Sequence, residues 1–241
     1  MTTHKTIDNL FNSNEDYSSQ DEKAFTDYYH QHREDFDSAV LTIFYGAPGT
    51  GKSVSMLKYV EQLQNQREAN ITIIDGKGVE WSYWTTDYDN VLDGDSDLVG
   101  IYTFFKVLRN DVENALRTGT SSDEIVVIDE SYLLFKDEGH SEVEALLVEL
   151  ILEDLTRIVQ IGRSSGVRVV IGTQRGTALP ISLRKNASMK FAMRMLFESE
   201  EEAAFGSVGS PSPVYIPKNR NGLAVVENAL KADGVRELVQ F

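Results

Sequence analysis

The chain contains no cysteine, which excludes a disulfide framework and a cysteine-based metal site. It also lacks an apolar run of the roughly 18 residues that a transmembrane helix needs, and no basic, then apolar, signal segment opens it. Its four histidines show no spacing typical of metal ligands. We therefore expect no membrane span and no structural metal. The missing cysteine fits a cytoplasmic setting, with association to a virion or to a membrane through a partner left open.

Positive charge is scarce, since 23 Lys and Arg face 38 Asp and Glu and the net charge is −15. This balance argues against a protein that coats nucleic acid, because phosphate neutralisation needs clustered cations. The charges are unevenly distributed, however. Residues 137–154 contain acids but no Lys or Arg, whereas residues 156–194 contain Lys and Arg but no acid. The asymmetry is compatible with a basic channel and predicts a face for an anion or for an acidic neighbouring subunit.

A glycine-rich loop lies between an expected strand at 41–45 and an expected helix at about 52–66. The loop has the pattern G-x-x-x-x-G-K-[ST], in which backbone N–H groups and the start of a helix surround phosphate. Lys52 would reach the β- and γ-phosphates of ATP, and the Ser53 hydroxyl would bind Mg²⁺. The predicted nucleotide-binding residues are Gly46, Ala47, Pro48, Gly49, Thr50, Gly51, Lys52, Ser53 and Val54.

Two acids follow a second apolar run. Residues 125–128 are β-branched and predict a strand buried on both faces of a parallel sheet. Such a strand gives no structural reason for Asp129 and Glu130 to follow it, although two solvated acids at a strand end are common. Beside the phosphate loop, Asp129 would hold Mg²⁺ and Glu130 would orient and deprotonate an attacking water.

Strands alternate with helices along the chain, which predicts an α/β fold with a mostly parallel central sheet flanked by helices, of the RecA-like P-loop type. Ligands bind such sheets at the carboxyl ends of the strands. Gln174 ends another buried strand at 168–174 and is a further catalytic candidate that would contact the γ-phosphate or the water. We expect a short strand at 99–102 before a helix at 104–117.

The first 38 residues are acidic and polar with scattered aromatics, and predict a partly ordered arm that precedes an ATPase domain at 39–241. Phe25, Tyr28 and Tyr29 have helical spacing. The segment 20–36 therefore reads either as an amphipathic helix that docks on the body or on a neighbour, or as disorder.

Several segments together resemble the FtsK/SpoIIIE/HerA superfamily of DNA-pumping ATPases. They are the phosphate loop, the segment 73–80, the strand that ends in Asp129 and Glu130, the segment 162–175, and the segment 180–186. The phosphate loop and the acid pair are shared by many ATPases, whereas 75–78 and 162–175 are more specific. The insertion between the phosphate loop and the acid pair is short, so the chain resembles a compact member of the kind carried by phages, plasmids or integrative elements.

The resemblance implies a ring, usually a hexamer, with ATP sites between subunits and a neighbour's arginine acting on the bound nucleotide. Arg163 is the first candidate for that arginine and Arg184 the second. The resemblance also implies movement along double-stranded DNA without sequence preference, through contacts to phosphates rather than bases. Candidate residues for those contacts are Lys77, Arg175 and Lys185.

Two alternatives use the same loop. A viral genome-packaging or morphogenesis ATPase has the same chemistry but docks on a capsid or membrane portal, with the acidic arm as the docking element. A small-molecule or nucleoside kinase is a more distant reading, because Glu130 directly after Asp129 favours water as the acceptor. No N-K-x-D motif for reading guanine is present, which argues against a GTPase switch.

Overall fold

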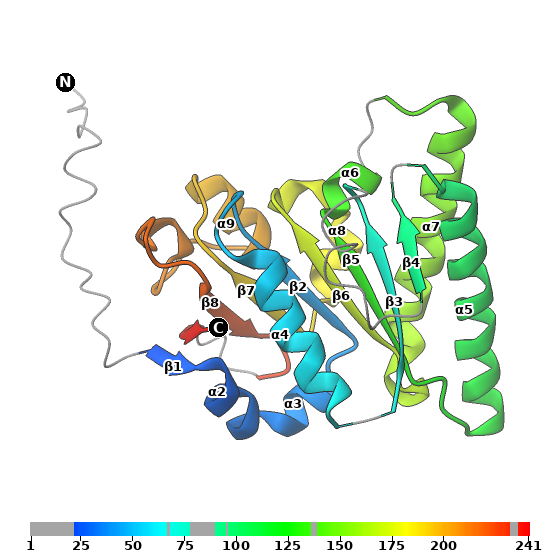
Figure 1. Cartoon of the computed structure of the whole chain (residues 1–241), viewed down its shortest axis with the longest axis horizontal. Helices are drawn as coiled ribbons and strands as arrows, with labels where there is room; N and C mark the ends of the chain where they lie inside the picture. The colour runs from blue at the N-terminus through cyan, green and yellow to red at the C-terminus, as the bar shows by residue number, and fades with distance from the viewer. Residues whose placement is uncertain (1–21, 67, 78–89, 95, 136–138, 232–235) are drawn as a thin grey trace.

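A computed structural model describes residues 22–66, 68–77, 90–94, 96–135, 139–231 and 236–241. The described strands form one nine-stranded sheet in the order β1-β9-β8-β7-β2-β6-β5-β3-β4 (Figure 1). Every neighbouring pair is parallel except the two that involve β8. The strands are β1 (Glu22–Ala24), β2 (Leu41–Tyr45), β3 (Asn70–Asp75), β4 (Asn90–Asp93), β5 (Glu124–Asp129), β6 (Arg168–Thr173), β7 (Met189–Ala192), β8 (Leu223–Asn228) and β9 (Arg236–Gln240).

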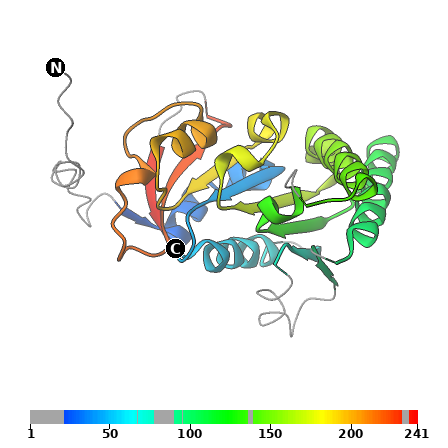
Figure 2. The same ribbon diagram turned by 90° about the horizontal axis from the view of Figure 1, so that it is seen from above.

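Helices cover both faces of the sheet, as the view from above shows (Figure 2). On one face α5 and α7 pack together, and α4 lies on the other. The helices are α2 (Phe25–Gln31), α3 (Arg33–Ser38), α4 (Lys52–Gln64), α5 (Leu98–Thr118), α6 (Ser131–Phe135), α7 (Glu142–Ile161), α8 (Ile181–Asn186) and α9 (Glu198–Phe205). The predicted α/β architecture with a mostly parallel sheet is confirmed. None of the described helices combines the length and apolarity needed to cross a bilayer.

Alternation along the central strands builds a separate core on each face of the sheet. In β5, Val126 and Ile128 join the core under α5 and α7, whereas Ile125 and Val127 join the core under α4. All four side chains are fully buried. A strand buried on both faces reads as a continuous apolar run because successive side chains point to opposite sides.

The N-terminal segment contributes to the core under α4. Phe25, Tyr28, Tyr29 and Phe36 of α2 and α3 are buried there. The interpretation of this segment as a helix that docks on the body therefore holds for the described residues, with a break between the two helices at His32. The division into arm and domain at residue 38 stays a prediction, and residues 1–21 lie outside the described residues.

The expected strand at 99–102 is wrong, because these residues form the first turns of α5. Asp97 caps that helix by accepting a hydrogen bond from the backbone N–H of Gly100 at 2.9 Å. A side-chain cap of this kind satisfies one of the free N–H groups at a helix start and favours helix over strand for the apolar run that follows.

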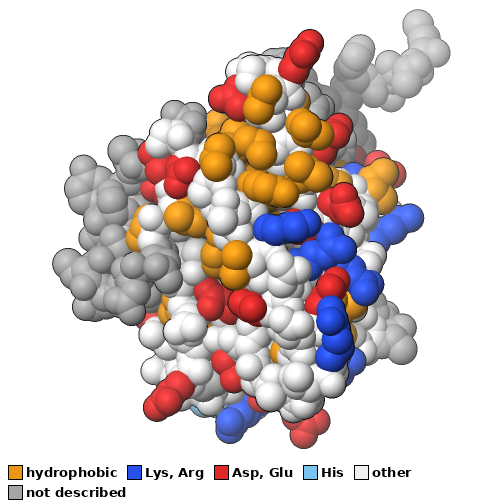
Figure 3. Space-filling model, turned by 90° about the vertical axis from the view of Figure 1, so that its right-hand side faces the viewer, with side chains coloured by type: hydrophobic (Ala, Val, Ile, Leu, Met, Phe, Trp, Pro, Cys, Tyr) orange, Lys and Arg blue, Asp and Glu red, His pale blue; other side chains and the backbone are white. Residues whose placement is uncertain are grey.

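The outer face of α5 and α7 carries apolar side chains beside a cluster of Lys and Arg (Figure 3). The large exposed hydrophobic residues of these two helices are Val99, Val107 and Leu116 of α5 and Val143 and Leu146 of α7. Arg109 of α5 donates to Asp154 of α7 at 2.6 Å, so an acid from the predicted acidic segment ties the two helices together.

Candidate active site

Three parallel strands end side by side at one edge of the sheet. β2 pairs with β6, which places Tyr45 opposite Thr173, and β6 pairs with β5. The phosphate loop leaves β2 at this edge, Asp129 ends β5, and Gln174 follows β6. The sheet order therefore brings together segments that are far apart in sequence, at the edge where parallel sheets bind ligands.

The phosphate loop has the backbone conformation that its glycines allow. Gly49 and Gly51 have φ of 75° and 88°, in the left-handed region that favours glycine. Thr50 donates through Oγ1 to the Ala47 carbonyl at 2.8 Å, which closes the loop on itself. Lys52 is the first residue of α4, so the loop leads directly into a helix N-terminus. This is the arrangement that binds phosphate through backbone N–H groups.

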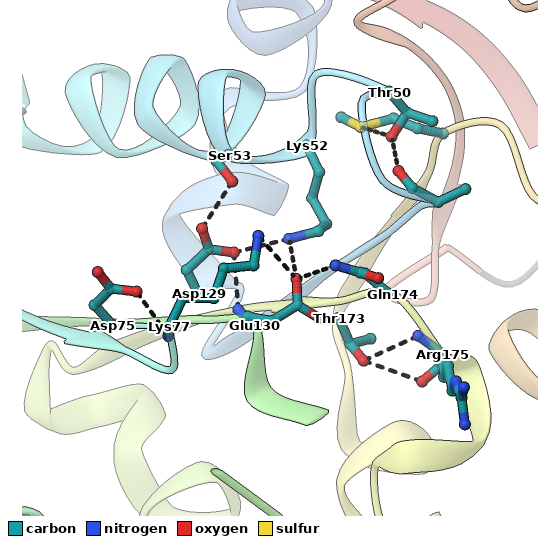
Figure 4. A network of polar contacts seen from close by, with 12 residues as sticks. Thr50, Lys52, Ser53, Asp75, Lys77, Asp129, Glu130, Thr173, Gln174 and Arg175 are labelled. Atoms are coloured by element: carbon teal, nitrogen blue, oxygen red, sulfur yellow. Dashed lines mark hydrogen bonds and ion pairs between the residues drawn. The ribbon is translucent and has the colours of Figure 1, made fainter. Parts of the chain in front are cut away.

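Lys52 and Ser53 both contact the acid that ends β5 (Figure 4). Lys52 Nζ lies 2.8 Å from Asp129 Oδ1, and Ser53 Oγ donates to Asp129 Oδ2 at 2.7 Å. The side chains of Lys52 and Asp129 are 7% and 2% exposed. Each carboxylate oxygen of Asp129 thus has a polar partner, as a buried charge requires.

Glu130 lies next to the same lysine but in an unusual backbone conformation. Its φ is 51°, which strains a residue with a side chain. Its Oε2 accepts a hydrogen bond from Gln174 Nε2 at 2.6 Å and lies 3.7 Å from the Nζ atoms of both Lys52 and Lys77. Four predicted site residues, Lys52, Asp129, Glu130 and Gln174, therefore form one contact network, and Lys77 joins them.

The oxygen atoms of Ser53 and Asp129 fit a magnesium ion. A hydroxyl and a carboxylate are hard oxygen ligands, and Mg²⁺ is commonly held by one or two such protein groups together with substrate phosphates and water. Within the described residues, no cluster of three or more acids and histidines offers a metal site made of protein alone. The pair is thus suited to a metal that arrives with a nucleotide.

Gly172 shapes this site without being evident in the motifs. A Cβ on Gly172 of β6 would lie 2.7 Å from Asp129 Oδ1 and 2.6 Å from the sulfur of Met56, so only glycine leaves room for both side chains. Sequence gave no signal for Gly172 beyond its position near a strand end.

The structure does not bring the candidate arginines into this network. Arg163 is exposed in a short 3-10 helix (Gly162–Ser165) that precedes β6, at the opposite edge of the sheet from the phosphate loop. Arg184 donates to the backbone carbonyls of Leu179 and Ala203 at 3.0 and 2.6 Å.

The residues predicted to contact DNA fall in different places. The Arg175 guanidinium lies over the Tyr132 ring, 4.8 Å from its centroid, close to the site. Lys185 is exposed in α8. Lys77 lies at the site itself, with Nζ 3.7 Å from Glu130 Oε2, and its contact with DNA stays a prediction.

Comparison with solved structures finds a similar fold in several nucleotide-hydrolysing proteins. The conjugation coupling protein TcpA of pCW3, determined with ATPγS, matches with a TM-score of 0.71 at 19% identity over 84% of this chain. The cytoplasmic domain of the type VII secretion ATPase EccC of Thermomonospora curvata matches with a TM-score of 0.63 at 18% identity over 83% of this chain. The genome packaging NTPase B204 of Sulfolobus turreted icosahedral virus 2, determined with ATPγS, matches with a TM-score of 0.54 at 16% identity over 84% of this chain.

These likenesses concern the fold, and they confirm the resemblance to FtsK/SpoIIIE/HerA ATPases at that level. The chain spans 60% of the TcpA chain and 25% of the EccC chain, but 97% of the B204 chain. No curated protein matches the sequence.

A family model built from sequences matches residues 42–198, which include the phosphate loop, the acid pair and Gln174. The matched segment is more than half of the chain and contains every residue of the contact network described above. The chain therefore belongs to the ATPase family associated with various cellular activities (AAA).

Proposed function

We propose that the protein hydrolyses ATP with Mg²⁺ at the edge formed by β2, β5 and β6. Lys52 neutralises charge on the β- and γ-phosphates, and Ser53 and Asp129 hold the metal, which supplies further charge neutralisation when bound. Glu130 accepts a proton from the attacking water. Gln174 orients that water or contacts the γ-phosphate.

One observation carries this proposal. The Lys52 ammonium lies 2.8 Å from Asp129 and 3.7 Å from Glu130, so the loop and the acid pair face one small volume. Both acids therefore lie within ion-pair distance of the lysine. A triphosphate entering the loop offers the lysine a stronger anion, so Asp129 and Glu130 become available for the metal and for water.

We further propose that hydrolysis drives movement along double-stranded DNA within a ring of identical subunits. The resemblance of the segments 75–78 and 162–175 to DNA-pumping ATPases supports this, as does the shared fold with a conjugation coupling protein and a genome packaging NTPase. Arg163 would act in trans, and its exposure leaves it available to a neighbouring subunit.

The test is phosphate release with and without duplex DNA at low salt. We expect a several-fold rise with duplexes of unrelated sequence and a loss of that rise as salt increases, because phosphate contacts release counterions. Arg163→Ala should remove multiple-turnover activity while ATP binding remains, with exposed Arg157→Ala as the matched control. Equal rates with and without DNA would reject DNA as the substrate.

A second candidate is packaging of a genome into a capsid, because the chain matches B204 over nearly the whole length of that protein. The acidic N-terminal segment is the proposed docking element. The helices α2 and α3 belong to the core, so the informative deletion is residues 1–21 rather than 1–38. Removal of residues 1–21 should preserve hydrolysis and weaken capture by procapsids, and unchanged capture would reject the docking role.

A further inference from the structure

Lys77 lies two residues after the end of β3, the strand that pairs with the strand carrying the acid pair. β3 pairs with β5 in parallel, with Asp75 opposite Asp129, so the residue two positions after Asp75 lies near Glu130. Lys77 Nζ is 3.7 Å from Glu130 Oε2, and the two side chains are 31% and 3% exposed. A partly exposed lysine therefore reaches inward to a buried carboxylate.

The turn that presents Lys77 is fixed at both ends. The Asp75 carboxylate accepts a hydrogen bond from the Lys77 backbone N–H at 3.0 Å, and the Gly76 N–H donates to the Asp129 carbonyl at 3.0 Å. Asp75 is 2% exposed. Its side chain thus shapes the turn from within.

Gly76 allows this turn to lie directly on the acid pair. A Cβ at that position would be 2.7 Å from the Glu130 carbonyl oxygen and 2.8 Å from that of Asp129. Both neighbours are backbone atoms, which cannot yield as the end of a flexible side chain does. The turn formed by Asp75, Gly76 and Lys77 therefore packs directly against the Glu130 backbone. Asp75 shapes the turn, Gly76 allows the close approach, and Lys77 reaches the Glu130 carboxylate.

We propose that Lys77 is a positioning residue for Glu130, an inference that rests on the proposed ATP hydrolysis. Gln174, Lys52 and Lys77 all contact the same oxygen of Glu130, Oε2. Contacts to one oxygen fix the plane of the carboxylate and assign the other oxygen, Oε1, to the proton of the attacking water. When ATP engages Lys52, Lys77 and Gln174 keep Glu130 in that orientation.

The first experiment compares Lys77→Met and Lys77→Arg with the wild type, using Mg²⁺·ATP and measuring kcat and KM separately. Lys77→Met keeps the length of the side chain and removes its charge. We expect kcat to fall roughly 10-fold with KM changed by less than about 3-fold, because general-base catalysis contributes roughly 10²–10⁴-fold and positioning accounts for part of it. Lys77→Arg should restore most of the rate.

Exposed Lys106 of α5 supplies the control, and Lys106→Met should match the wild type in both constants. Thermal unfolding of each variant identifies any loss of folded protein, and the arginine variant keeps the charge should the methionine variant fold poorly. An unchanged kcat in Lys77→Met, or a rise in KM alone, overturns the positioning role. A DNA-dependent defect without a change in basal kcat also overturns it.

A double-mutant cycle separates action through Glu130 from direct action on the phosphates. In the Glu130→Gln background, measured in single turnovers, Lys77→Met should have no further effect, since its partner has lost its charge. An additive loss in the double variant overturns the inference and leaves ATP hydrolysis standing. A wild-type protein with no hydrolysis above Lys52→Ala overturns the proposed function and this inference with it.

Discussion

The nucleotide edge of the sheet and the aromatic core under α4 lie on the same strands but are stabilised in opposite ways. At the edge, buried charges contact one another and the backbone of Glu130 is strained. In the aromatic core, Phe36 is fully buried and its ring packs against Tyr29 and Tyr59, with centroids 4.6 and 5.6 Å apart. Such contacts bury apolar area without an electrostatic cost.

The difference indicates which region serves chemistry and which serves stability. Buried ion pairs contribute little net stability because desolvation offsets attraction, whereas buried rings contribute substantially. Substitutions at the edge that leave no buried charge unpaired, such as Glu130→Gln, should therefore lower the rate while the protein stays folded. Substitutions in the aromatic core should lower the free energy of unfolding while the remaining folded molecules work normally.

The largest effect is expected from Glu130→Gln, which keeps size and hydrogen bonding but removes the base. We expect the hydrolysis rate to fall by roughly 10²–10⁴-fold while ATP still binds. Phosphate release and fluorescent-nucleotide binding measure the two properties. Exposed Glu142→Gln is the control at another acid. A hydrolysis rate within about 3-fold of the wild type would assign the base elsewhere.

Phe36→Ala should have the next largest effect, on the other side of the comparison. Removal of a fully buried ring should lower the free energy of unfolding by about 3–5 kcal/mol. Urea denaturation measures this, with Phe197→Ala as the control because that ring is 62% exposed. A loss below about 1 kcal/mol would mean that α3 is not part of the stable core.

Gln174→Ala should reduce kcat by about 10-fold, less than the loss in Glu130→Gln. The reason is that a hydrogen bond to a charged group contributes roughly 1.5–3 kcal/mol. Exposed Gln160→Ala provides the comparison at a surface amide. Steady-state rates decide the matter, and wild-type turnover in Gln174→Ala would remove this amide from the mechanism.

The smallest effect concerns neither region. Ser141 caps α7 in a capping box with Glu144, and Ser141→Ala should cost about 1 kcal/mol of stability with no change in rate. The hydrogen bond from the Ser141 backbone N–H lowers the pKa of Glu144. Its stabilisation is therefore present above the ordinary pKa of a glutamate and is lost as the pH falls, which urea titrations at pH 7 and pH 3 would test.

Much of the fold and of the site could be predicted from local patterns. β2, β5 and β6 are apolar runs with no competing interpretation, and the motifs at their carboxyl ends converge because a parallel sheet requires it. Gln174 could be predicted by the same reasoning. These segments meet because neighbouring parallel strands place their carboxyl ends at the same edge of the sheet.

The remaining features depend on contacts that a local pattern does not contain. The run at 99–102 has strand-like composition, and the Asp97 cap makes it helical. Lys77 reaches Glu130 because Gly76 lets two backbones touch, a consequence of β3 pairing with β5. Helical spacing in α2 is visible in the sequence. Two ring partners of Phe36, Tyr59 of α4 and Phe191 of β7, are distant in sequence and emerge only in three dimensions.

The most direct test of the account is a crystal structure with Mg²⁺ and a non-hydrolysable ATP analogue. The account predicts phosphates in the loop at 46–53, Lys52 moved from Asp129 to the β- and γ-phosphates, and the Glu130 carboxylate facing the γ-phosphate. A nucleotide bound elsewhere, or a Glu130 side chain turned away from the γ-phosphate while Lys52 stays on Asp129, would contradict it.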